Sequence, residues 1–104
     1  MQTIVIVLDA QKMENPDLDI RYSLPDRIAA YTNGQVIDNG YDFLSDSELG
    51  IWLETADAVS GAEQIAALLS AERFSENDLS QIAEIYISEE DSASVGNCRK
   101  VYPA

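Results

Sequence analysis

The chain has 104 residues, 46% of them hydrophobic, which suits one domain (1–104) with an ordinary core and argues against a disordered polyelectrolyte. Nineteen Asp and Glu against six Lys and Arg give a formal net charge of −13, so nucleic acid and anionic membranes would repel it. There is no histidine, the usual general base and zinc ligand. We therefore expect a protein that is not an enzyme, has no catalytic residues, and binds no metal, cofactor, nucleic acid or membrane.

Cys98 is the single cysteine, which excludes an internal disulfide and suits a reducing compartment. The segment 1–9 lacks the basic start and long apolar run of a signal peptide, and no segment is long enough to span a membrane. We expect a cytoplasmic protein.

The first predicted element is a central strand over Thr3–Asp9, which is apolar on both faces. Gln11–Tyr22 turns polar around a proline and predicts a loop. A short helix is then predicted from about Leu24 to Thr32, with Ser23 as its cap and Asn33-Gly34 as its left-handed stop. Its apolar face would hold Leu24, Ile28 and Tyr31.

Two apolar segments, Val36–Leu44 and Leu49–Leu53, flank the turn-rich Ser45–Glu48 and predict a β-hairpin. Asn39-Gly40 could form a hairpin turn of its own. Each arm would then have only about three residues, which is marginal. We prefer a single strand with a bulge at Gly40.

Ala56–Glu72 is the clearest helix, with Thr55 or Asp57 as its cap. A strand over Gln81–Ser88 follows, and Cys98–Tyr102 could add an edge strand. The apolar stripe of the helix would comprise Val59, Ala62, Ile65, Ala66 and Leu69.

This order of strand, helix, strand, strand, helix and strand predicts an α+β protein of the ferredoxin-like split β-α-β type, βαββαβ with a fifth C-terminal edge strand. Both helices would cover one face of an antiparallel sheet. Val5, Val7 and parts of Trp52 and Tyr86 would then lie on the opposite face. Apolar residues there need cover from a partner or a second copy, which is the basis for expecting a homodimer through the open sheet face.

Three patterns could carry chemistry, and each has a plainer interpretation. Asp17 and Asp19 could bind a divalent cation, but two carboxylates fit almost any acidic loop. The segment 38–42 resembles calcium loops without their closing glutamate. Cys98 has two basic neighbours but no histidine to act as its base. We interpret Asp17 and Asp19 as solvated, the calcium-loop pattern as too incomplete to indicate a site, and Cys98 as a structural cysteine.

The distribution of charge is more informative, because the segment from Ile28 to Glu72 contains no Lys or Arg. Acidic residues interleaved with aromatic ones suit a surface that docks a basic partner, although a merely solubilising surface would also be acidic. The candidate partner-binding residues are Asp38, Tyr41, Asp42, Asp46, Glu48, Trp52, Glu54 and Asp57.

A small, acidic, histidine-free chain with aromatics among its carboxylates resembles the immunity proteins that bacteria pair with secreted toxins. This resemblance in general character implies a stoichiometric inhibitor whose carboxylates cover the positively charged active site of a basic toxin domain, such as a nuclease. The alternative is a ferredoxin-like homodimeric sensory or scaffold domain that binds a small molecule or a partner enzyme.

Overall fold

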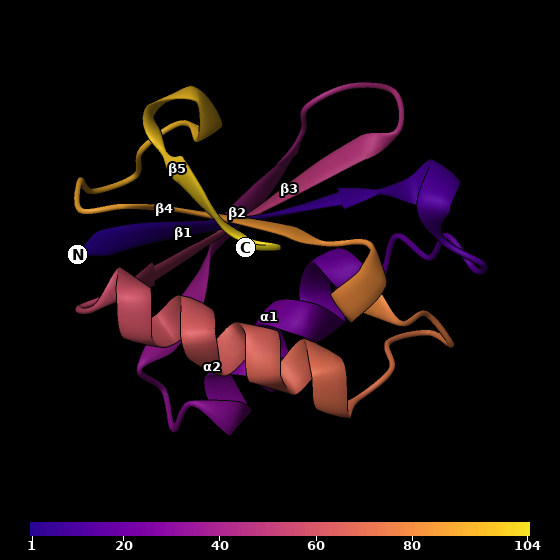
Figure 1. The fold of residues 1–104 in the computed structure, drawn as a ribbon, viewed down its shortest axis with the longest axis horizontal. Coiled ribbons are helices and arrows are strands. Elements are labelled where there is room, and N and C mark those ends of the chain that lie inside the picture. Colours follow the sequence, from indigo (N-terminus) through magenta and orange to yellow (C-terminus); the bar gives the residue numbers. More distant parts are fainter.

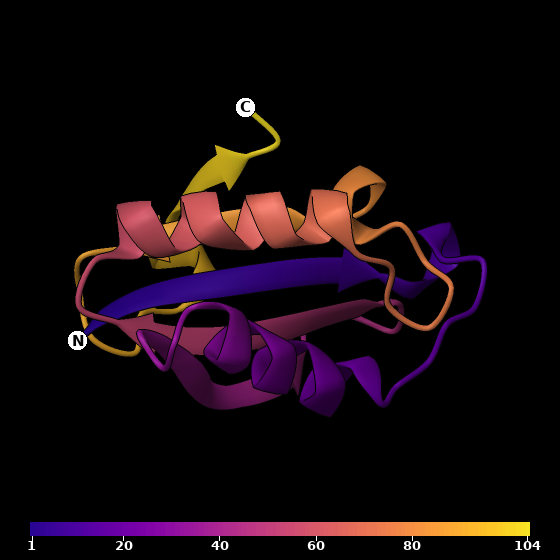
Figure 2. The same ribbon diagram turned by 90° about the horizontal axis from the view of Figure 1, so that it is seen from below.

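Strand β1 (Gln2–Asp9) lies inside a five-stranded antiparallel sheet in the computed structural model, which describes all residues 1–104. Both helices lie side by side on one face of this sheet (Figures 1 and 2). The α+β class, the predicted element order and the fifth strand are confirmed. The other elements are α1 (Ile20–Tyr31), β2 (Val36–Phe43), β3 (Glu48–Thr55), α2 (Ala58–Ala71), β4 (Glu84–Ser88) and β5 (Arg99–Tyr102), with 3₁₀ turns at Ala10–Lys12, Leu79–Gln81 and Val95–Asn97.

The strand order β2-β3-β1-β4-β5 follows from the two helical crossovers. The α1 crossover leaves one strand position between β1 and β2, which β3 fills, and the α2 crossover does the same for β3 and β4, with β1 between them. As a result β2 is one edge of the sheet and the short β5 is the other.

The core lies between the sheet and the helices. Ile4, Ile6 and Leu8 of β1 are fully buried there together with Ile51, Leu53, Ile65 and Leu69. Helix α2 packs very close to the sheet, because a Cβ at Gly61 would lie 2.8 Å from Cδ1 of Ile4. This approach requires the absence of a side chain at position 61.

Helix α1 begins at Ile20, one turn before the predicted start at Leu24, so the prediction of a loop was wrong for its last three residues. Ile20 is fully buried and continues the stripe of Leu24 and Ile28, and burial of this side chain extends the helix. Pro25 consequently lies inside the helix rather than in its first turn. Tyr31, predicted on the buried face, is 39% exposed.

Two other details differ from the sequence predictions: the buried face of α2 and the start of β4. The stripe of α2 includes Leu68 instead of Val59, which is half exposed. Strand β4 begins at Glu84 rather than Gln81, because the Asp78 carboxylate accepts a hydrogen bond from the Ser80 amide and holds a 3₁₀ turn there.

The hairpin of β2 and β3 has the predicted bulge. Its register shifts between Asp38 and Tyr41, and Gly40 has a φ of +96°, a left-handed conformation that favours glycine. The alternative of a separate small ribbon at Asn39-Gly40 is therefore wrong.

The sheet face opposite the helices is covered by the chain itself. Residues 89–98, which we call the strap, join β4 to β5 and lie on this face (Figure 1). Thr3 of β1 accepts a hydrogen bond from the Ala93 amide and donates one to the Glu90 carbonyl. Val5 is 0% and Val7 5% exposed, so the prediction that these residues need cover from another chain was wrong. No helix has the length and apolar character of a membrane span.

Candidate protein-binding surface

Strand β2 is unusually exposed for a strand of this sheet. It is an edge strand, and seven of its eight residues are exposed to solvent. Side chains alternate between the two faces of a strand, so β2 and β3 present one set on the helix side and another on the strap side. The candidate residues divide between these two sides.

On the helix side, three aromatic rings form a row from α1 to β2. The Tyr22 and Tyr41 ring centroids are 5.9 Å apart, and those of Tyr41 and Phe43 are 6.0 Å apart, both edge to face. These three side chains are 51%, 41% and 52% exposed. Edge-to-face packing is a favoured geometry of aromatic pairs, so the row offers contact area that is already arranged before a partner binds.

Arg21 stacks on this row. Its guanidinium carbon lies 4.5 Å from the Tyr22 ring centroid and 5.2 Å from that of Tyr41. The Nη1 group donates to the Leu18 carbonyl at 3.0 Å. This nearby cation lowers the pKa of Tyr22. Arg21 therefore stabilises the aromatic row by cation–π contact.

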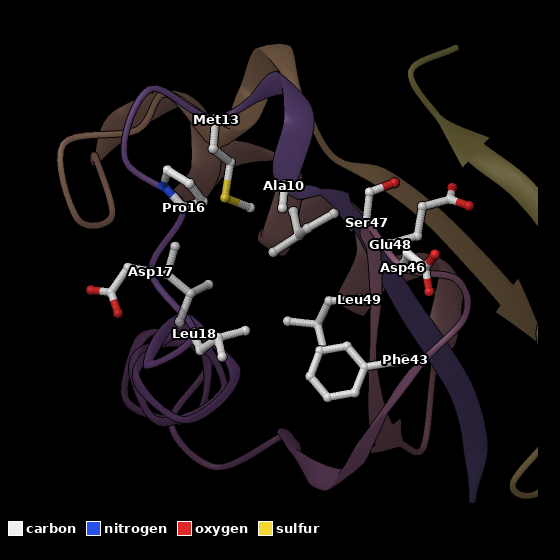
Figure 3. A pocket seen from close by; sticks show the side chains of 12 residues that line it. Ala10, Met13, Pro16, Asp17, Leu18, Phe43, Asp46, Ser47, Glu48 and Leu49 are labelled. Carbon is white, nitrogen blue, oxygen red and sulfur yellow. The ribbon is translucent and has the colours of Figure 1, made fainter.

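A pocket of about 150 Å³ opens beside Phe43, between the segment after β1 and the hairpin turn (Figure 3). Phe43 and Leu49 point across it toward Leu18 and Met13. It is lined by Leu8, Ala10, Met13, Pro16, Asp17, Leu18, Ile20, Phe43, Asp46, Ser47, Glu48 and Leu49. The walls are mainly apolar, and the three charged residues that line the pocket, Asp17, Asp46 and Glu48, are all acidic.

Asp17 is one of these acids, and its carboxylate is used within the chain. It accepts hydrogen bonds from the Ser75 hydroxyl at 2.7 Å and the Asp19 amide at 2.9 Å, which together lower the pKa of Asp17. In Figure 3 its carboxylate points away from the pocket. Asp17 thus secures the pocket wall to the turn after α2.

On the strap side, Trp52 is half buried. Its ring covers Gly50, and its indole Nε1–H donates to the Ala93 carbonyl at 2.8 Å. Asp42 lies on this side because it pairs with Gly50. Glu48 and Glu54, two residues from Gly50 and Trp52 respectively, share the same face. Trp52 therefore packs with the strap and is apart from Tyr41.

The remaining candidates lie at the ends and edge of the hairpin. Asp46 is exposed in the turn. Asp57 is exposed and caps α2 by accepting from the Ser60 amide at 3.1 Å, one of the two caps that the sequence offered. The structure thus brings Asp46, Glu48 and Phe43 together around one pocket, but leaves Glu54 and Asp57 outside it.

Asp38 and Asp42 act on the exposed edge itself. The Asp38 carboxylate accepts from the Gly40 amide at 2.9 Å, and that of Asp42 accepts from the Phe43 amide at 2.8 Å. Two backbone donors of the edge strand are therefore occupied by side chains of the same strand. This arrangement, with the bulge, discourages addition of a foreign β-strand.

The hairpin carboxylates have no ionic partner in the chain. There are only two ion pairs, Arg27 with Glu72 and Lys100 with Glu84, and neither involves β2, β3 or their turn. The hairpin charge is thus available to a second molecule.

Cys98 is half buried, and burial raises the pKa of its thiol, with a further increase from Glu90. A raised pKa makes the reactive thiolate scarcer at neutral pH. This favours the structural interpretation of Cys98.

Sequence reasoning missed Leu18 and Tyr22, which it placed in a polar loop. The available signal was that Leu18 lies between Asp17 and Asp19, and that Tyr22 follows three residues later, in a segment without the alternation of a strand. Only the tertiary structure shows that Leu18 lines the same pocket as Phe43 and that Tyr22 belongs to the same aromatic row.

No protein-family model matches the sequence, and neither a curated protein nor a solved structure matches it.

Proposed function

We propose that this protein is a non-catalytic binding protein that docks a basic protein through its β2–β3 hairpin. One observation carries the proposal: the same hairpin bears exposed aromatic rings on its helix side and, at its turn and on its strap side, carboxylates that have no ionic partner in their own chain. Unpaired carboxylates accelerate association with a basic partner, and exposed aromatic rings supply contact area.

Within this class we propose an immunity protein that neutralises a basic toxin, such as a nuclease, by covering its active site. A nuclease site is positively charged because it binds phosphates. The hairpin carboxylates would pair with the same Arg and Lys side chains. The net charge of −13 and the resemblance to immunity proteins support this proposal.

The mode of contact follows from the edge strand. Because Asp38 and Asp42 occupy two of its amides, the partner would meet side chains rather than extend the sheet. Tyr41 and Phe43 would meet the partner on the helix side of this edge, Asp46 at the hairpin turn, and Asp42 and Glu48 on the strap side.

The alternative of a homodimeric sensory or scaffold domain rested on an open sheet face. Val5 and Val7 are buried, Val5 has Trp52 and Tyr86 as its cross-strand neighbours, and the strap is bonded to this face. No uncovered row of valines therefore remains there to favour this alternative. Two copies at −13 would also repel each other.

The test is co-expression with the C-terminal toxin domain of a large secreted protein encoded directly upstream. We expect rescue of growth, and a complex whose association rate falls steeply with salt. The triple variant Asp42→Asn, Asp46→Asn and Glu48→Gln should associate about tenfold more slowly.

The matched control is Glu63→Gln, Glu76→Gln and Glu89→Gln, three exposed acids outside the hairpin that change the net charge equally. Equal slowing by both triple variants would exclude the hairpin as the docking site. A metabolic enzyme or transporter in the adjacent gene, with no toxin to neutralise, would exclude the immunity role.

A further inference from the structure

The pocket beside Phe43 has the size and lining of a receptor for one side chain. An apolar cavity of about 150 Å³ can hold a benzene-sized group. The pocket is open to solvent, and its walls Leu18 and Phe43 remain 56% and 52% exposed. The isolated chain leaves these apolar surfaces in water, and an inserted apolar group would cover them.

The charges around this pocket restrict what can bring such a group. Asp46 and Glu48 lie on its hairpin side, the Asp17 carboxylate on the opposite side points away from it, and no Lys or Arg lines it. Arg21 is close by, but its guanidinium is stacked on Tyr22 and Tyr41. Lys12 directly precedes the lining residue Met13 but lines a different pocket. The field at the mouth is therefore negative and favours cations beside the inserted group.

We propose that this pocket receives a single apolar side chain, of leucine, methionine or phenylalanine size, which a basic partner presents between Lys or Arg residues. The inference rests on the proposed function and names the anchor by which the partner is held. The carboxylates steer the basic segment toward the hairpin, and the pocket selects those segments that carry an apolar residue at the centre.

The probe is a blocked synthetic peptide, Lys-Arg-Leu-Arg-Lys, added to the full ¹⁵N-labelled chain at low salt. Matched peptides replace its leucine by serine, or its four basic residues by glutamate. We expect amide shifts around Leu18, Phe43 and Leu49 with the leucine peptide, and about tenfold weaker binding of the serine peptide. The glutamate peptide should not bind.

Two variants of the protein test the location. Leu18→Ser should weaken binding of the leucine peptide at least about fivefold and leave the serine peptide unchanged. Leu44→Ser is the control, because Leu44 is 40% exposed but lies on the strap side, near Gly50, and does not line the pocket. It should bind both peptides as the unmodified chain does.

The outcomes separate this proposal from the proposed function. Equal affinity for the leucine and serine peptides, with shifts spread over the acidic surface, overturns the anchor pocket and leaves a purely electrostatic docking surface. Equal effects of Leu18→Ser and Leu44→Ser also overturn it. Absence of binding by both basic peptides at low salt contradicts the docking surface together with its pocket.

Discussion

Gly50 shows how one residue joins the hairpin to the strap. A Cβ at this position would lie 2.7 Å from Cζ3 and 3.1 Å from Cη2 of Trp52. The ring cannot move away freely, because its indole N–H is bonded to the Ala93 carbonyl. We therefore expect Gly50→Ala to reduce the free energy of unfolding by about 1–3 kcal/mol, the usual cost of overpacking.

Urea denaturation followed by Trp52 fluorescence measures this loss. Gly96→Ala is the control, since a Cβ at Gly96 would meet no atom within 4 Å. A stability of Gly50→Ala equal to that of the control would show that the ring does not depend on this glycine.

The ion pair of Arg27 and Glu72 links α1 to the end of α2 and makes stability depend on pH. Two hydrogen bonds, of 3.0 Å and 2.6 Å, join the guanidinium to the carboxylate, and Arg27 lowers the pKa of Glu72. Since the folded pKa is below the unfolded one, the stabilisation is complete at neutral pH. It declines as the pH falls below the unfolded value toward the folded one.

We expect Glu72→Gln to be less stable than the unmodified chain at pH 7, and the difference to shrink below about pH 5. The effect should be modest and reduced by salt, because both side chains are about 40% exposed. Thermal unfolding across this pH range, with Glu63→Gln as an unpaired control, measures it. A difference that grows on acidification would contradict the pairing.

At the scale of elements, one hydroxyl makes two of the hydrogen bonds that hold the strap on the sheet. Thr3 is 1% exposed, and its Oγ1 donates to the Glu90 carbonyl at 2.7 Å while accepting from the Ala93 amide at 3.1 Å. Thr3→Val keeps the shape but leaves two backbone groups unsatisfied, at a cost of about 1–3 kcal/mol. The strap should then open more often.

Hydrogen exchange of the Ala93 amide measures this opening. We expect faster exchange in Thr3→Val and near-normal exchange in Thr3→Ser, which retains the hydroxyl. If both variants exchange at the rate of the unmodified chain, the hydroxyl does not hold the strap.

At the scale of elements, local sequence signals gave the wrong start of α1 and the wrong buried face of α2 where burial of an apolar side chain competed with them. Ser23 and Pro25 predicted a helix start at Leu24, but burial of Ile20 begins α1 four residues earlier. Val59 fits a helical stripe by spacing, yet Leu68 occupies the buried face. The bulge at Gly40 and the stop at Asn33-Gly34 were predictable, because positive φ values at Asn and Gly are properties of single residues.

At the scale of the whole molecule, the chain has a net charge of −13 and forms only two ion pairs. Self-repulsion among the remaining carboxylates opposes compaction, and salt screens it with a Debye length of about 10 Å at 0.1 M. We expect the Tm to rise by a few degrees, about 3–8 °C, between low salt and 0.5 M NaCl. Differential scanning calorimetry at neutral pH measures the shift.

The triple variant of Asp42, Asp46 and Glu48 should show a smaller rise in Tm with salt, because it carries less charge. A Tm that falls with salt would mean that attractive ion pairs dominate the charge balance.

The sequence by itself determined the order of elements, the α+β class and the acidity of the hairpin, because periodicity, turn residues and net charge are local or additive properties. Only the tertiary structure decided that Tyr41 and Trp52 lie on opposite sides of one hairpin, since their sides depend on the register with Ile51 and Gly50. It also decided that Leu18, Phe43 and Leu49 line one pocket and that the strap covers Val5. These contacts join residues far apart in the chain, and packing of the whole sheet against α1, α2 and the strap determines them.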